Sequence, residues 1–234
     1  MIGTTSFFNL LAGYVFVILL PIITLYIVYL VVVRAFRSMG FSALEAIIIV
    51  FSSFVFGSGI IDGIGGITFS NVPLFVYHHF WVVGINIGGA VIPILLSIYL
   101  AVKNRINMMG ILLGTATVAL ITFFVTYSDP EKGIVSPFPF WLLPAMGASI
   151  VALFLSKKEK QKTAPLAYIS GTVGVLIGAD VFHLLELLEN DIQSSRNAVI
   201  GGASVFDMIF ITGILAVFLD SVLVVHQKRK KERK

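Results

Sequence analysis

Two acidic residues lie inside strongly apolar stretches of this chain, where an ionised carboxylate is costly. Asp180 and Asp207 stand about eight residues from the facing ends of two successive apolar segments, 164–188 and 199–225. A charge in the hydrocarbon of a bilayer costs at least about 2.5–3.5 kcal/mol, so such acids are candidates for function. If both segments are antiparallel helices, a rise of 1.5 Å per residue places both carboxyls about 12 Å below one surface. The spacing therefore predicts two carboxyls at one depth on adjacent helices.

Two carboxyls that meet in a medium of low dielectric constant cannot both ionise cheaply. They would share one proton, and the pair could carry protons, bind a cation or activate a water molecule. The alternative is two separate protonated acids, each hydrogen-bonded to a neighbouring helix as part of the packing. Both interpretations remain open at the level of the sequence.

Other polar side chains are expected at a similar depth. Asn86 lies about ten residues into an apolar segment, and Ser204 precedes Asp207 by three residues, so the two share a helix face. His183 follows Asp180 at the same interval, which would begin a relay toward the surface or mark the polar end of a helix. We therefore expect these residues to bind an ion or a small solute together with the acids. No metal site is expected, because no standard ligand spacing is present.

Glycine is frequent beside these polar residues. The glycines that flank Asn86 and the two acids are Gly88, Gly89, Gly178, Gly201 and Gly202. One interpretation is close helix contact, which small residues permit and which the GxxxG spacings at 110–114 and 174–178 also favour. The other is local unwinding, after which freed backbone carbonyls would line a cavity.

The elements that must position these residues belong to a chain that is too apolar for a water-soluble fold. Of its 234 residues 58% are hydrophobic and 12% are charged, and the mean hydropathy is +1.01. A soluble domain has roughly 25% charged residues, so soluble enzymes, nucleic-acid modules and disordered tails are excluded as descriptions of the whole chain. The apolar segments are roughly 10–33, 43–61, 76–102, 108–127, 140–156, 164–188 and 199–225.

The predicted fold class is all-α, a polytopic membrane helix bundle of about seven transmembrane helices. It would form a single domain over residues 1–225, followed by a basic cytoplasmic tail at 226–234. The chain has no cysteine, which excludes disulfides, thiolate metal sites and a thiol nucleophile. No cofactor is expected.

The positions of the basic residues predict an orientation. Nearly all of the 16 Lys and Arg follow the first, third, fifth and seventh segments, and the exceptions are Lys132 and Arg196. Because Lys and Arg stay in the cytoplasm, the N-terminus is expected outside and the C-terminus inside. We therefore expect a multi-pass protein of the plasma membrane, whose basic tail contacts anionic lipid rather than nucleic acid.

Three sequence motifs carry a resemblance to a known family. They are NIGGAVIP at 86–93, IGAD at 177–180, and IGGA at 200–203 followed by Phe206 and Asp207. Together they resemble a domain-of-unknown-function family of bacterial and archaeal multi-pass membrane proteins, over roughly residues 84–220. This resemblance implies the fold class and no activity.

A looser likeness is to intramembrane aspartyl proteases of the presenilin and signal-peptide-peptidase type. Their two catalytic acids stand in a Tyr-Asp and a Gly-x-Gly-Asp motif, to which Phe206-Asp207 and the run 177–180 are similar. The order along the chain is reversed, Ile177 and Ala179 replace both glycines, and no Pro-Ala-Leu motif follows. What this likeness implies is a catalytic dyad of Asp180 and Asp207.

Three functions are compatible with these observations. The first is a transporter-like membrane protein in which Asp180 and Asp207 bind or relay a proton or cation coupled to a small solute, with the other polar residues and the glycine-flanked backbone along its path. The second is an intramembrane aspartyl protease, in which one Asp is the general base and the other the general acid. The third is a non-catalytic membrane scaffold. The sequence names neither the solute nor the coupling ion, the oligomeric state or an enzymatic activity.

Overall fold

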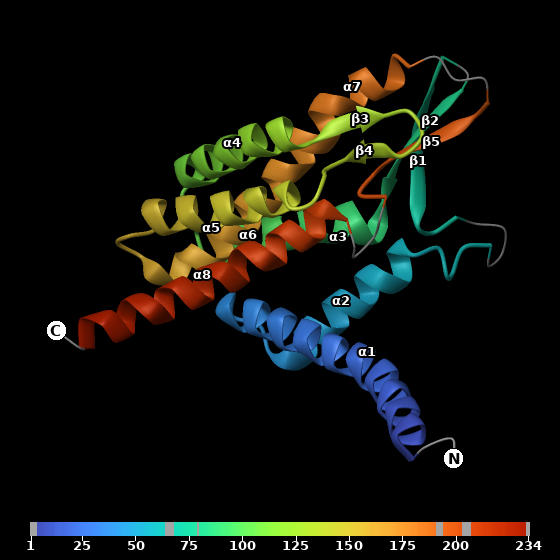
Figure 1. Cartoon of the computed structure of the whole chain (residues 1–234). Helices are drawn as coiled ribbons and strands as arrows, with labels where there is room; N and C mark the ends of the chain where they lie inside the picture. The colour runs from blue at the N-terminus through green and yellow to red at the C-terminus, as the bar shows by residue number, and fades with distance from the viewer. Residues whose placement is uncertain (1–3, 64–67, 79, 191–193, 203–206, 233–234) are drawn as a thin grey trace.

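The computed structural model describes residues 4–63, 68–78, 80–190, 194–202 and 207–232. Helices account for most of this part of the chain, as the predicted class requires (Figure 1). The α-helices are α1 (Thr4–Ser38), α2 (Ala43–Gly57), α3 (Ile92–Lys103), α4 (Met108–Val125), α5 (Leu143–Leu155), α6 (Thr163–Val175), α7 (Phe182–Leu188) and α8 (Met208–Glu232).

Shorter elements connect or extend these helices. The π-helical turns η2 (Ile87–Val91) and η5 (Leu176–Val181) continue directly into α3 and α7, and the 3-10 turns are η3 (Phe140–Leu142) and η4 (Lys160–Lys162). Both π-helical turns fall on glycine-containing motifs, so the helices are locally unwound at the places where glycine allowed it. The basic tail does not begin a separate element, because α8 continues to Glu232.

Three helical runs are long and apolar enough to cross a membrane. They are Gly13–Ser38, Met108–Val125 and Lys160–Leu188. Four shorter apolar helices are Ala43–Gly57, Ile87–Lys103, Phe140–Leu155 and Met208–Leu223. Each predicted apolar segment therefore contains a helix, and the length and composition of three helices are those of membrane spans.

The expectation of an all-α fold was incomplete, because five strands among the described residues lie at one end of the molecule (Figure 1). In a three-stranded sheet, β1 (Asn71–Tyr77) is antiparallel to β2 (Trp81–Asn86), and β5 (Arg196–Ile200) is parallel to β2. A second sheet pairs β3 (Tyr127–Asp129) with β4 (Gly133–Val135).

The helices predicted at 76–102 and 199–225 were wrong in their first residues, which form the end of β1 and all of β2 in one case and the last two residues of β5 in the other. Both runs are rich in Val and Ile, which suit a strand as well as a buried helix. A continuous apolar run does not distinguish the two by periodicity. The pairing of Ile85 with Ile200, more than a hundred residues apart, decides the outcome.

The first three basic loops lie together at the end of the molecule opposite the strands (Figure 1). The ammonium of Lys103 lies 5.1 Å from the centre of the Phe41 ring, which joins the loop after α3 to the loop after α1. Lys162 Nζ donates to the carbonyl of Arg105 at 3.1 Å, which joins the loop after α5 to the loop after α3. The charge pattern predicted this shared end.

Glycines allow α4 and α6 to pack closely in the centre of the bundle. A Cβ atom on Gly114 would clash with Ser170, one on Gly174 with Val118, and one on Gly178 with the backbone of α4. The close contact predicted from the GxxxG spacings is therefore confirmed. It holds η5, and with it Asp180, against α4.

Helix α1 is packed differently from the rest of the bundle. Its side chains from residue 13 to residue 30 are exposed, and burial begins near Val33, where Ala35 and Phe36 pack into the core. Among the α1 residues whose side chains are described, only those near the C-terminal end of the helix are thus covered by α2 and α8 (Figure 1).

Candidate functional site

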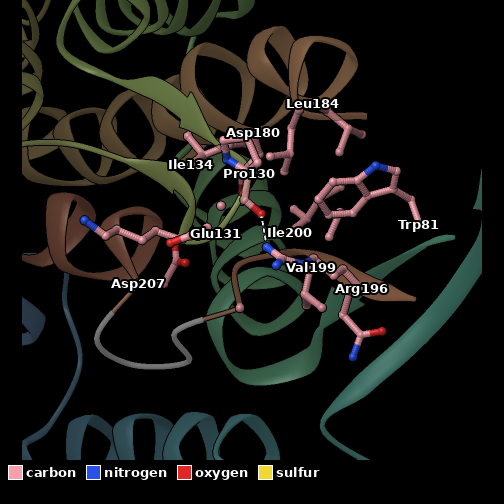
Figure 2. A pocket seen from close by; sticks show the side chains of 16 residues that line it. Trp81, Pro130, Glu131, Ile134, Asp180, Leu184, Arg196, Val199, Ile200 and Asp207 are labelled. Carbon is pink, nitrogen blue, oxygen red and sulfur yellow. Dashed lines mark hydrogen bonds between the residues drawn. The ribbon is translucent and has the colours of Figure 1, made fainter. Parts of the chain in front are cut away.

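Asp180 and Asp207 line one cavity at the strand end of the bundle (Figure 2). The cavity has a volume of about 800 Å³ and lies between β5, the loop from β3 to β4, η5 with α7, and the residues before α8. A smaller cavity of about 320 Å³ faces the bundle and is also lined by both acids. The two carboxyls therefore border both spaces, and they are close enough for their charges to interact.

The position of Asp180 depends on a glycine turn after β5. One carboxylate oxygen, Oδ2, accepts a hydrogen bond from the N–H of Gly201 at 3.3 Å. Gly201 has a φ of +69°, and a Cβ atom there would lie 2.7 Å from Ala90 and from the backbone of Gly89. Only glycine fits this conformation and this space, so the turn that supplies the donor to Asp180 requires it.

Asp207 begins helix α8. Its Oδ1 accepts from the N–H of Ile209 at 2.8 Å, and its carbonyl accepts from the N–H of Ile211 at 3.0 Å. This is the arrangement of an N-cap residue, in which a carboxylate meets the positive end of the helix dipole. The sequence expected Asp207 inside a helix that starts near Val199, and the strand β5 is the reason that the helix starts later.

Lys132 and Arg196, the two exceptions to the charge pattern, line the same cavity as the acids. The guanidinium Nη1 of Arg196 donates to the carbonyl of Pro130, which ties β5 to the loop between β3 and β4 (Figure 2). Lys132 is exposed beside Glu131 at the rim. The cavity therefore presents both signs of charge. From the sequence, these two residues served only to predict the topology, although their position on the side with few basic residues was a signal for a site.

Asn86 is held in a buried junction instead of lining these cavities. Its Nδ2 donates to the carbonyl of Gly57 at 2.9 Å and to Oδ1 of Asn71 at 2.8 Å, and its Oδ1 accepts from the N–H of Gly89 at 2.7 Å. A Cβ atom on Gly88 would clash with the backbone of α2. Asn86 and its two glycines thus join α2, β1 and η2, and none of the three lines either cavity of the acids. The backbone of Gly89 does lie beside the Gly201 turn that binds Asp180.

His183 faces α4 rather than the cavities. Its Nδ1 lies 2.8 Å from Oε2 of Glu186, and its Nε2 lies 3.2 Å from the carbonyl of Phe123, to which it donates. The ring also stacks on the Phe123 ring at 4.9 Å. His183 therefore satisfies a carbonyl in the last turn of α4. Gly202 does line the larger cavity, and Ser204 lies outside the described residues.

Asp220 is a third acid in an apolar helix, and the sequence analysis did not single it out. It is 3% exposed, and its Oδ1 has no hydrogen-bond partner among the described residues. It lines a separate cavity of about 820 Å³ at the basic end, between α1, the loop before α6, and α8. Its place within the predicted segment 199–225 was the signal that could have found it.

Asp62 follows α2 and serves the loop that leads to β1. Its Oδ1 accepts from the N–H groups of Phe69 and Ser70, and its Oδ2 accepts from the Ser70 hydroxyl. The hydrogen bond from the Ser70 hydroxyl is the main cause that lowers the pKa of Asp62. Within the described ranges, no group of three His, Asp or Glu side chains could hold a metal ion.

The fold and these cavities define a largely helical protein with helices of membrane-spanning length and a small sheet at one end. A family described as a protein of unknown function, DUF1614, matches residues 66–219. The chain belongs to this family, and the predicted resemblance to a domain-of-unknown-function family is confirmed. No curated protein and no solved structure matches the chain.

Proposed function

We propose that this protein is a transporter-like integral membrane protein in which Asp180 and Asp207 bind or relay a proton or cation coupled to a small solute. The observation that carries the proposal is the cavity of about 800 Å³ that both acids line. Its volume is that of a site for a small molecule. Asp180 lies within the helical run Lys160–Leu188, which has the length of a membrane span. Acids within membrane segments mark ion and substrate pathways, which favours transport over packing.

The proposed topology has seven transmembrane helices in the plasma membrane, with the N-terminus outside and the C-terminus in the cytoplasm. The shared position of the basic loops supports this orientation, because Lys and Arg stay on the cytoplasmic side. The strands then lie at the outer surface, since open strand edges are not tolerated in the hydrocarbon. The cavity with the acid pair would open toward the outside.

The groups around the acids would set what the pair can do. Two neighbouring carboxyls repel each other when both are ionised, which favours the uptake of one proton or one cation between them. The N–H of Gly201 and the N-terminus of α8 stabilise the ionised form of each acid. The pair would therefore alternate between occupied and empty states, while Lys132 and Arg196 offer charges to an acidic group of the solute.

The test measures ion flux in vesicles that contain the full-length protein. A pH-sensitive dye inside the vesicles reports protons driven inward by a potassium diffusion potential, and radioactive sodium reports the alternative ion. We expect flux well above that of protein-free vesicles, and we expect Asp180→Asn and Asp207→Asn to reduce it to that background. Glu189→Gln is the matched control, because Glu189 is exposed and does not line the cavity.

Two outcomes would contradict the proposal. One is full flux in the Asp180→Asn, Asp207→Asn double variant, provided that gel filtration and thermal unfolding show an intact fold. The other is no flux of either ion in the wild type, combined with cleavage of a transmembrane peptide that the same two variants abolish. The second result would identify the pair as a protease dyad.

A further inference from the structure

The cavity at the basic end carries a second site that is separate from the acid pair. It has a volume of about 820 Å³, and neither Asp180 nor Asp207 lines it. Its walls come from α1, from the loop that contains Lys160, and from Phe218, Asp220 and Ser221 of α8. This inference does not depend on the proposed transport function.

Among the described residues, no ion pair joins the charged groups of this cavity to one another or to other side chains. Asp220 is 97% buried, yet its Oδ1 has no hydrogen-bond partner in the described part of the chain. Arg34 ties α1 to α8, because its Nε donates to Ser221 Oγ at 3.0 Å. Arg37 and Lys160 line the same cavity and are exposed. A buried acid without a donor is costly, so a donor from outside the chain would stabilise it.

The wall formed by α1 indicates that the ligand is a lipid. Ile27 and Leu30 line the cavity, and their side chains are 54% and 47% exposed. They belong to the apolar run Gly13–Ser38, which has the length of a membrane span. A cavity with basic groups at the end of such a helix lies at the level of lipid headgroups, and acyl chains could extend along the apolar wall.

We propose that this cavity binds a phosphatidylethanolamine-type lipid. Its phosphate would contact Arg34, Arg37 and Lys160, and its primary ammonium would donate to Asp220. A purely anionic headgroup would bring negative charge against the Asp220 carboxylate, and a simple cation would meet three basic side chains. A headgroup that carries both charges satisfies both sets of groups. A choline headgroup lacks the N–H donors that the Asp220 oxygen needs.

The experiment measures lipid binding by the purified full-length protein, with native mass spectrometry and thermal unfolding as readouts. The probes are phosphatidylethanolamine, phosphatidylglycerol and phosphatidylcholine of identical acyl chains. We expect phosphatidylethanolamine to bind most tightly. Arg34→Gln should weaken it roughly tenfold or more, because one partner of a charge pair is lost. Asp220→Asn should remove the preference over phosphatidylcholine. Lys158→Gln is the matched control. It removes one positive charge, as Arg34→Gln does, but Lys158 does not line the cavity, so the substitution should not change lipid binding.

Three results would overturn the proposal. One is equal binding of phosphatidylethanolamine and phosphatidylcholine by the wild type, a comparison that needs no variant to fold. Another is tighter binding of phosphatidylglycerol that Asp220→Asn leaves unchanged, which would mean an anionic lipid. The last is binding of soluble glycerophosphoethanolamine as tight as that of the lipid, which would mean a soluble ligand.

Discussion

The two cavities at opposite ends of the molecule hold their acids in different ways. At the strand end, Asp180 accepts a hydrogen bond from Gly201 and Asp207 accepts one from Ile209, so the backbone itself supplies the donors. At the basic end, Oδ1 of Asp220 has no donor among the described residues, although Arg34 lines the same cavity. The difference between the two ends is therefore whether the fold supplies a hydrogen-bond donor to the acid. The first pair is positioned by the fold, whereas the third acid is left for a ligand to complete.

The family match separates the two ends as well. The range 66–219 contains Asp180, Asp207 and the strands around them, and it ends one residue before Asp220. Arg34 and Arg37 also lie outside this range. The acid pair therefore belongs to the part of the chain that the family covers, and the basic-end cavity is built partly from residues beyond it.

The largest expected effect is on ion flux and separates the cavities directly. Asp207→Asn should abolish flux in vesicles, whereas Asp220→Asn should retain flux close to that of the wild type. The reason is that Asp220 lines a different cavity. None of the residues that line it also lines a cavity of the acid pair. If Asp220→Asn also abolishes flux with an intact fold, the two cavities belong to one route.

A large effect on stability is expected from the glycine turn that positions Asp180. Gly201→Ala should lower the free energy of unfolding by about 3 kcal/mol or more, because a left-handed backbone and a clash with Ala90 act together. Gly133→Ala is the matched control, since Gly133 has a φ of +82° and open space around it. It should cost only about 1 kcal/mol. Chemical denaturation in detergent measures both, and equal costs would contradict the tight turn.

Replacing an acid by an apolar residue should change the free energy of unfolding moderately, with opposite signs at the two ends of the molecule. In detergent without lipid, Asp220→Leu should raise the free energy of unfolding by about 1 kcal/mol, because an unpartnered buried group is removed. Asp207→Ala should lower it by about 1 kcal/mol, because the cap of α8 is lost. Thermal unfolding of the two variants checks both signs. A destabilised Asp220→Leu variant would show that Asp220 already has a partner.

The smallest effect concerns pH at the rim of the acid-pair cavity. The N–H groups of Glu131 and Lys132 donate to Asp129 at 2.8 and 3.0 Å and lower its pKa, with the bond from Glu131 as the larger cause. Because the pKa is lower in the folded protein, this stabilisation is present above the unfolded value of about 3.9 and is lost as the pH falls through the folded value.

Asp129→Asn should therefore lower the unfolding temperature slightly at neutral pH. The difference from the wild type should shrink as the pH falls below about 4. Thermal unfolding over a pH series checks this prediction, and a difference that stays constant down to low pH would show that the carboxylate is not the cause.

The apolar segments, the shared end of the basic loops and the small-residue helix faces suited to close packing could all be predicted from the sequence. These properties are local or additive along the chain. Hydropathy sums over a window, charge marks each loop separately, and the spacing of Gly174 and Gly178 defines one helix face regardless of its partner. For the same reason the seven apolar segments each contain a helix.

Which partner each polar group binds depends on long-range contacts of the fold. The pairing of β5 with β2 turned the start of two expected helices into strands and moved Asp207 to the beginning of α8. Contacts with α2 engaged Asn86 in a buried junction, and contacts with α4 engaged His183. Each of these outcomes depends on a hydrogen-bond partner far away in the chain. The residue type shows that a partner is needed, but only the fold selects which one is within reach.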